Sequence, residues 1–231
     1  MVLTARGTVA AAGQAVTAVT AITGTGLLVA APARGEIIDR IAVSVGNRVI
    51  TQTDLDREIR ITALLNGEKP DFSPAHKREA AERMVDQVLV RNELEDSRYP
   101  LPSAADVDAA VKEFKSRYAD EAAYRRALAE YGVSEEDLRT RLLWQLTLVR
   151  FIDVRFRPGI QITDDEIRDY FNQHLRTIYM RAHPGQAPSL DDYRESVEQT
   201  LISQAANQQV EEWLKEARRR TRIQYHEEAF Q

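Results

Sequence analysis

The chain has 231 residues, a formal net charge of −5, 29 % charged side chains and no cysteine. The absence of thiols excludes disulfides, thiolate catalysis and a lipid-modified cysteine at an export junction, and the acidic balance makes nucleic acid an unfavourable partner. Many helix formers among the charged residues favour an extended helical body.

Residues 1–33 differ from the rest of the chain because Arg6 is their one charged side chain. They are mostly Ala, Val, Thr and Gly, and Ala31-Pro32-Ala33 fits a small-residue cleavage motif. We therefore predict a signal peptide at 1–33, with a retained membrane anchor or a disordered tail as the alternatives; glycines within the apolar run weaken the anchor. Cleavage would leave 30 Lys and Arg against 36 Asp and Glu, a net charge of −6, and no stable membrane insertion.

The stretch 37–65 predicts a β-hairpin that runs directly into a helix. Ile41, Val43 and Val45 alternate with polar or small residues, Gly46-Asn47 suits a tight turn, and 48–51 returns as the second strand. Thr53 is the predicted N-cap of the following helix. Because an isolated two-stranded hairpin is only marginally stable in water, a third strand or a helical layer must come from elsewhere in the chain.

Helical periodicity continues beyond this first helix, and local cap residues mark where each segment begins and ends. The predicted boundaries are the end of the first helix at Asn66-Gly67, a second helix from Ser73-Pro74 to about Ser97, a third from Ser103 with Asp106, and a fourth from Asp120 to Gly132. Ser134 with Asp137 then begins the most apolar helix after the export segment, which we predict to be the central core helix.

The last third of the chain predicts two more helices and a closing strand. Thr163 with Glu166 forms a capping box, 176–189 is predicted to be irregular, and a long final helix begins near Ser189. Its terminal arginines, 218–220, suit the negative end of a helix, and we favour a solvated terminus over a site for anionic lipid or an acidic partner. Residues 221–226 alternate as a strand that would pair with either strand of the hairpin.

No constellation of residues typical of an enzyme is present. The four histidines lie in different predicted elements without metal-ligand spacing, so neither a catalytic residue nor a metal ligand is predicted. The acidic groups at 135–137 and 164–166 lie in helix first turns, where capping explains them. Phosphate-binding and dinucleotide-binding glycine motifs are also absent, and no cofactor is predicted.

Several aromatic side chains follow the predicted helices. Such residues are more often core than binding surface, although a tyrosine with one solvated edge suits adaptable peptide contacts. The candidate peptide-binding residues are Tyr118, Tyr124, Tyr131, Phe156 and Tyr170.

The sequence from Ile38 to Asp56, IDRIAVSVGNRVITQTDLD, resembles the hairpin and helix start of the SurA-type periplasmic chaperones. The order of the following helices is also similar, through the phrase Ile162-Thr163-Asp164-Asp165-Glu166-Ile167 and again over 190–226. Family members commonly carry parvulin-type isomerase domains after that phrase. Here 176–189 is too short for a domain, which needs at least about 50 residues, so no catalytic residue is carried over and the chain resembles a member without the insert.

The resemblance implies a mostly α (α+β) fold: a helical chaperone domain over 34–231 with a small antiparallel sheet formed by the N-terminal hairpin and a C-terminal strand. It further implies an ATP-independent holding chaperone in the periplasm or cell envelope that binds unfolded or outer-membrane client polypeptides and is not an enzyme. Two alternatives remain open: a prolyl isomerase-related protein with residual activity, and a dedicated interaction subunit for one envelope partner.

Overall fold

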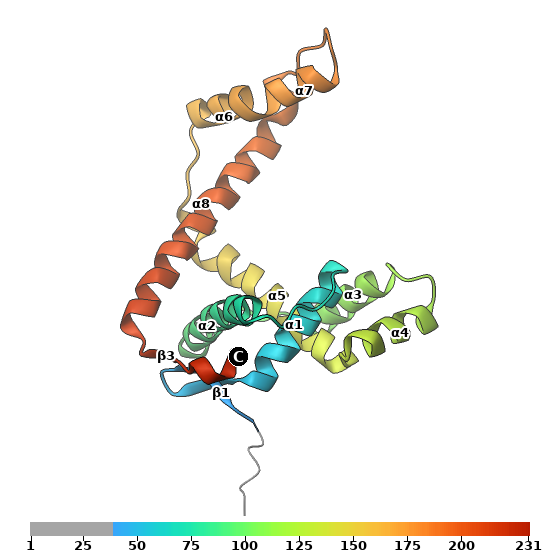
Figure 1. Ribbon diagram of the computed structural model, residues 1–231. Coiled ribbons are helices and arrows are strands. Elements are labelled where there is room, and N and C mark those ends of the chain that lie inside the picture. Colours follow the sequence, from blue (N-terminus) through green and yellow to red (C-terminus); the bar gives the residue numbers. More distant parts are fainter. Residues whose placement is uncertain (1–38) are drawn as a thin grey trace, which may run out of the picture. The chain divides into compact units, whose positions relative to one another are not determined.

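The computed structural model describes residues 39–231, which belong to one unit of the chain, Ile37–Gln231. This unit is mostly helical with a small antiparallel sheet, so the predicted fold class is confirmed (Figure 1). The predicted signal peptide lies outside the described residues. The elements are β1 Ile41–Val45, β2 Arg48–Thr51, α1 Gln52–Asn66, α2 Pro74–Asp96, α3 Ala104–Lys115, α4 Glu121–Tyr131, α5 Glu135–Arg155, α6 Asp164–Tyr170, α7 Thr177–Ala182, α8 Leu190–Arg220 and β3 Ile223–Tyr225, with single 3₁₀ turns at Arg157–Gly159 and Glu227–Ala229.

The closing strand pairs with the hairpin, as the marginal stability of a two-stranded ribbon requires. The strand order is β2-β1-β3, and both pairings are antiparallel. Val43 lies opposite Ile50 of β2 and Tyr225 of β3. The predicted third strand is therefore confirmed, and of the two hairpin strands it pairs with β1.

One detail of the predicted alternation in β1 is wrong. Ile41 pairs with Thr51 while Val43 pairs with Ile50, so β1 carries one extra residue at this point of the ladder. Such a bulge reverses the side-chain alternation. Ile41 is accordingly 45 % exposed, while Ala42 and Val43 are fully buried.

The N-cap of helix α1 lies two residues before the predicted one. Thr51, not Thr53, is the N-cap: its hydroxyl accepts the N–H of Asp54 at 3.2 Å, and the Asp54 carboxylate accepts the N–H of Thr51 at 3.0 Å. The reciprocal pair satisfies two donors that would otherwise have no partner at the helix start, which Thr53 inside the helix cannot do. Strand β2 therefore passes into α1 without a loop.

The other predicted caps are confirmed. Ser103, Ser134 and Thr163 form capping boxes with Asp106, Asp137 and Glu166, and Ser73 caps α2 ahead of Pro74. Gly67 and Gly132 end α1 and α4 in the left-handed region, with φ of 71° and 62°.

The buried side chains form four clusters. The first joins the sheet with α1, α2 and the turn at Glu227–Ala229; the second joins α1, α3, α4 and α5. The third joins α2, α5 and α8, and the fourth joins α6 to the beginning of α8. Helix α5 contributes Leu138 to the second cluster and Phe151 to the third, which fits its predicted central position, although Val149 is 56 % exposed.

The prediction that 176–189 is irregular is wrong for the first part of the segment, which is helical. Helix α6 continues through a π-helical stretch, Phe171–Arg176, into α7, and only the residues after Ala182 lack helix before α8 begins. Helix α7 buries none of its residues, and Ile178 is 64 % exposed. Because the periodicity of buried apolar positions is the main sequence signal for a helix, a helix without a buried face gives little warning.

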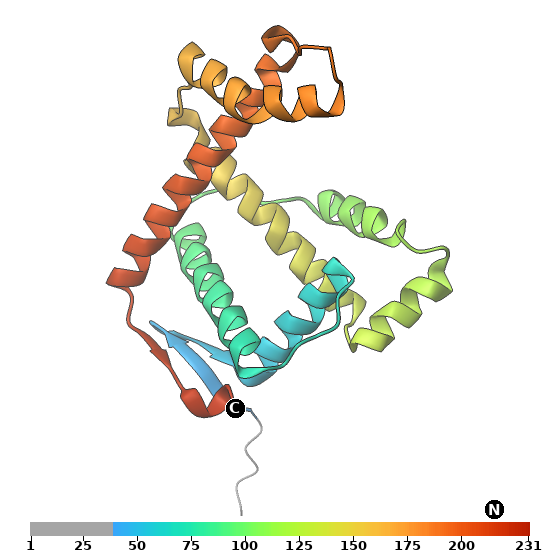
Figure 2. The same cartoon turned by 45° about the horizontal axis from the view of Figure 1, so that its top comes forward.

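Helix α8 runs from the α6–α7 end of this unit back to the sheet, where β3 follows it (Figures 1 and 2). The predicted solvated arginine terminus is wrong for Arg218. Its guanidinium donates to Asp86 at 2.7 Å and to Glu82 at 2.6 Å, both on α2. These two hydrogen bonds raise the pKa of Arg218 further, and they tie the end of α8 to α2.

Candidate functional site

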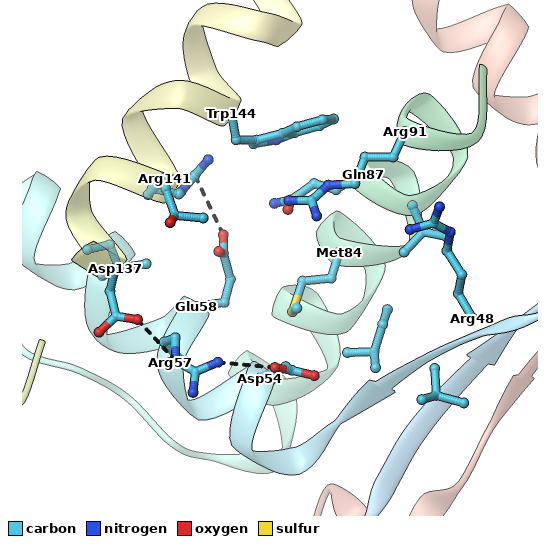
Figure 3. A pocket seen from close by; sticks show the side chains of 15 residues that line it. Arg48, Asp54, Arg57, Glu58, Met84, Gln87, Arg91, Asp137, Arg141 and Trp144 are labelled. Carbon is cyan, nitrogen blue, oxygen red and sulfur yellow. Dashed lines mark hydrogen bonds and ion pairs between the residues drawn. The ribbon is translucent and has the colours of Figure 1, made fainter. Parts of the chain in front are cut away.

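A groove lies between the beginning of α1, the middle of α2, the beginning of α5 and the edge strand β2. Its volume is about 470 Å³, and Figure 3 shows side chains from these elements converging on it. A second hollow of about 360 Å³ lies between α1, α3 and α5. We take the first as the candidate site, because it is larger and combines apolar walls with converging charged groups. Its lining residues are Arg48, Val49, Ile50, Asp54, Arg57, Glu58, Ile61, Met84, Gln87, Val88, Arg91, Asp137, Thr140, Arg141 and Trp144.

Four side chains on one face of α2 form one side of this groove. Gln87 and Val88 lie three and four residues after Met84, and Arg91 lies three residues after Val88, so the four share one face of the helix. Met84 and Val88 are half-buried and form part of the apolar wall, while Arg91 is exposed. Met is an adaptable side chain that fills irregular space, which suits a surface that meets more than one shape of ligand.

The strand side of the groove carries an exposed apolar residue. Val49 in β2 is 52 % exposed, whereas its neighbour Ile50 is 2 % exposed and belongs to the first core cluster. Since β2 occupies one edge of the three-stranded sheet, Val49 presents its side chain at the rim of the groove.

Ion pairs connect the α1 and α5 sides of the groove. Arg57 lies between two carboxylates, 3.2 Å from Asp54 and 3.3 Å from Asp137 (Figure 3). Partial burial opposes ionisation of Asp137, but the hydrogen bonds from Ser134 and the charge of Arg57 outweigh it and hold its pKa below the usual value. Asp137 therefore belongs to both the α5 cap and the groove.

A buried carboxylate lies deeper in the same groove. Glu58 is 7 % exposed, and one of its oxygens lies 3.5 Å from the guanidinium of Arg141. The Thr62 hydroxyl donates to the same oxygen at 3.4 Å. A buried carboxylate is costly unless it is paired, so Arg141 compensates a charge that the fold has buried.

The five candidate peptide-binding residues lie elsewhere. Tyr118, Tyr124 and Tyr131 belong to the second core cluster, Phe156 to the third and Tyr170 to the fourth. Tyr124 is 1 % exposed and Phe156 is 7 % exposed, and burial raises the pKa of Tyr124 to about 12. The structure does not bring the five together on one surface, and none of them lines the groove; whether any of them contacts a peptide stays a prediction.

Met84, Val88 and Trp144 lie among the apolar residues of two predicted helices, but the sequence did not identify them as the wall of a cavity. A signal was present on α2, where Gln87 and Arg91 interrupt an apolar face at helical spacing. Nothing local in the sequence joins that face to Glu58 or Arg141, because their contacts depend on how α1, α2 and α5 pack.

Neither metal sites nor membrane-spanning helices are found in the described part of the chain. Within residues 39–231, no group of three or more His, Asp or Glu side chains is arranged to hold a metal ion. Over the same residues, every helix falls short of the combined length and apolarity that crossing a bilayer requires.

Comparison with known proteins gives one similarity that bears on function. No protein-family model matches the chain. The chain is 25 % identical over 204 residues to the protein named Chaperone SurA of Alkalilimnicola ehrlichii, which covers 79 % of this chain and 47 % of that protein. The chain thus spans about half the length of this relative, and the similarity points toward a chaperone-type role.

Proposed function

We propose that this protein is an ATP-independent holding chaperone of the cell envelope that binds segments of unfolded polypeptides, outer-membrane proteins among them, without a catalytic step. The observation that carries the proposal is the open groove between β2, α1, α2 and α5. The similarity to a chaperone over 79 % of the chain supports the same class of activity.

The groove has the properties that a binder of many sequences needs. Exposed Val49 and half-buried Met84 and Val88 offer an apolar contact surface. The flexible Met84 side chain can adapt to different ligands, so this surface can contact many sequences. The net charge of −5 keeps the chaperone apart from other copies of itself while that surface is exposed. Binding would bury apolar client segments that otherwise associate with one another.

The proposal includes the domain organisation expected from the sequence. Residues 1–33 would direct export and 34–231 would form the chaperone domain, in the periplasm. The 176–189 region would mark the position at which longer relatives carry an inserted domain, with α7 at its beginning.

Suppression of aggregation tests the proposal. An unfolded outer-membrane β-barrel protein is diluted from urea into buffer with increasing amounts of the mature protein, and light scattering is followed. We expect scattering to fall at up to several-fold molar excess of chaperone. Unchanged scattering over that range contradicts the proposal.

A pair of variants tests whether the groove is the binding surface. Val49→Asp introduces a charge at the rim of the groove, and Val154→Asp introduces the same charge on α5 at a residue that is 46 % exposed and lies outside both hollows. Burying a valine side chain contributes about 1.5–3 kcal/mol, so Val49→Asp should weaken client binding about tenfold or more. Val154→Asp should bind like the wild type. Equal behaviour of the two variants would place binding elsewhere.

A further inference from the structure

The groove contains one positive charge, that of Arg91, that is paired with no carboxylate of the described chain. Three arginines of the groove have acidic partners: Arg48 with Glu95, Arg57 with Asp54 and Asp137, and Arg141 with Glu58. Within residues 39–231, Arg91 takes part in no ion pair and no hydrogen bond.

Trp144 fixes the position of that charge. The guanidinium carbon of Arg91 lies 5.0 Å from the centroid of the Trp144 ring, and Trp144 is 7 % exposed and packed in the third core cluster. A cation held over the face of a rigid, buried indole loses little further freedom when it binds a ligand. Arg91 is exposed, so its donors remain accessible from the groove.

The surroundings of Arg91 favour the arrival of an anion. Neighbouring protein atoms displace water from its guanidinium, and the charge of Arg48 repels it; both effects lower the pKa of Arg91. Glu95 and Glu58 attract it only through space. Because arginine remains protonated in proteins, the charge persists, and the attraction of a carboxylate bound there would compensate the cost of both effects.

We propose that Arg91 binds the carboxylate of an acidic side chain within an otherwise apolar client segment, whose flanking side chains pack on Val49, Met84 and Val88. This inference rests on the proposed function and adds a preference for one class of client segment. The fork of guanidinium donors matches a carboxylate in shape and in charge.

An internal Asp or Glu fits the site better than a chain terminus does. The apolar wall includes residues from both β2 and α2, so a segment with apolar residues on either side of its acid can contact both. The net charge of −5 gives no long-range attraction to acidic clients. The preference must therefore act at short range, within a Debye length of about 8–10 Å.

Matched peptides test the proposal on the mature, full-length domain. The first peptide is a fluorescent, acetylated and amidated nonamer with one central Glu among apolar residues, and its twin carries Gln in place of Glu. A third peptide carries Gln and a free C-terminal carboxylate. Binding is measured by fluorescence anisotropy at low and high salt.

Three variants accompany the wild type. Arg91→Gln removes the charge, Arg91→Lys retains it, and Arg83→Gln removes an exposed arginine from α2 outside the groove. All should melt within a few degrees of the wild type, because neither Arg83 nor Arg91 takes part in an ion pair of the described chain and Arg91→Gln removes only the contact with the Trp144 ring. The melting temperature thus separates a binding defect from a folding defect.

We expect the wild type to bind the Glu peptide about tenfold more tightly than either Gln peptide, the ratio expected for one charge-assisted hydrogen bond, and to lose part of this ratio at high salt. Arg91→Gln should abolish the ratio, Arg91→Lys should keep part of it and Arg83→Gln should keep all of it. Equal binding of the Glu peptide and its twin, or a ratio that survives Arg91→Gln, overturns the inference but leaves the proposed function standing. Tighter binding of the free-terminus peptide alone also overturns it, and no binding of any peptide contradicts the proposed function itself.

Discussion

Phe230 offers a sharp test of whether the C-terminal end of the chain stabilises the fold. The residue is 4 % exposed and lies in the first core cluster with Val43 and Val85, which belong to β1 and α2. The guanidinium of Arg78 lies 5.2 Å from the centroid of its ring. Phe230→Ala would remove a buried side chain that connects the two ends of the described chain.

The structure sets the expected magnitude. Replacing a buried phenylalanine by alanine costs about 3–5 kcal/mol, because the transfer free energy of the ring is lost and a cavity remains. For a protein of this size, each kcal/mol lowers the melting temperature by about 2–4 °C. The expected decrease in melting temperature is therefore about 6–20 °C. The loss of about 3–5 kcal/mol is a large share of the total stability of about 5–15 kcal/mol that is usual for a domain.

Thermal unfolding followed by circular dichroism measures this decrease, and urea unfolding at 25 °C gives the free energy directly. Gln231→Ala is the matched control, since Gln231 is exposed and its hydrogen bond to Lys77 uses the backbone oxygen. Deleting residues 222–231 should destabilise the protein at least as much as Phe230→Ala. A Phe230→Ala variant that melts within about 1 °C of the wild type would refute the role assigned to this end of the chain.

Two further predictions concern helix ends. Gly132→Ala should lower the free energy of unfolding by about 1–2 kcal/mol because φ is +62°. It should cost more than Gly67→Ala, since the added Cβ would lie 3.1 Å from Arg60 Nη1, whereas no atom lies within 4 Å of a Cβ added at Gly67. Equal losses in urea unfolding would mean that Arg60 moves away. The N–H and hydroxyl of Ser103 hold the pKa of Asp106 below its usual 3.8, so this carboxylate stabilises the fold above about pH 4 and its contribution is lost as pH falls further. Asp106→Asn should accordingly be less stable than the wild type at neutral pH, and the two stability curves should converge in acid; a constant gap at every pH would contradict this assignment.

The sequence by itself determined the local structure. Capping boxes at 103–106, 134–137 and 163–166 lie where the pattern predicted them, because the side chain that accepts and the N–H that donates are three residues apart. The Gly46-Asn47 turn, the left-handed Gly67 and Gly132 and the alternating strand near the end of the chain depend equally on near neighbours.

The errors in the predicted local structure also have local causes. Thr51 displaced Thr53 as the cap because Thr51 and Asp54 can satisfy each other, whereas the bulge at Ala42 turned Ile41 outward. Helix α7 lacks a buried face and so left no periodic pattern.

Only the tertiary structure decided which segments meet. The choice of β1 as the partner of β3, the ion pairs of Arg218 with α2 and the burial of Phe230 all join residues more than a hundred positions apart. The groove likewise combines positions from β2, α1, α2 and α5, and an apolar helix face has the same periodicity whether it packs in a core or lines a cavity. A charge that has no partner among the described residues, such as that of Arg91, becomes visible only when every neighbouring carboxylate has been placed, since pairing is a property of distance in space and not of position in the chain.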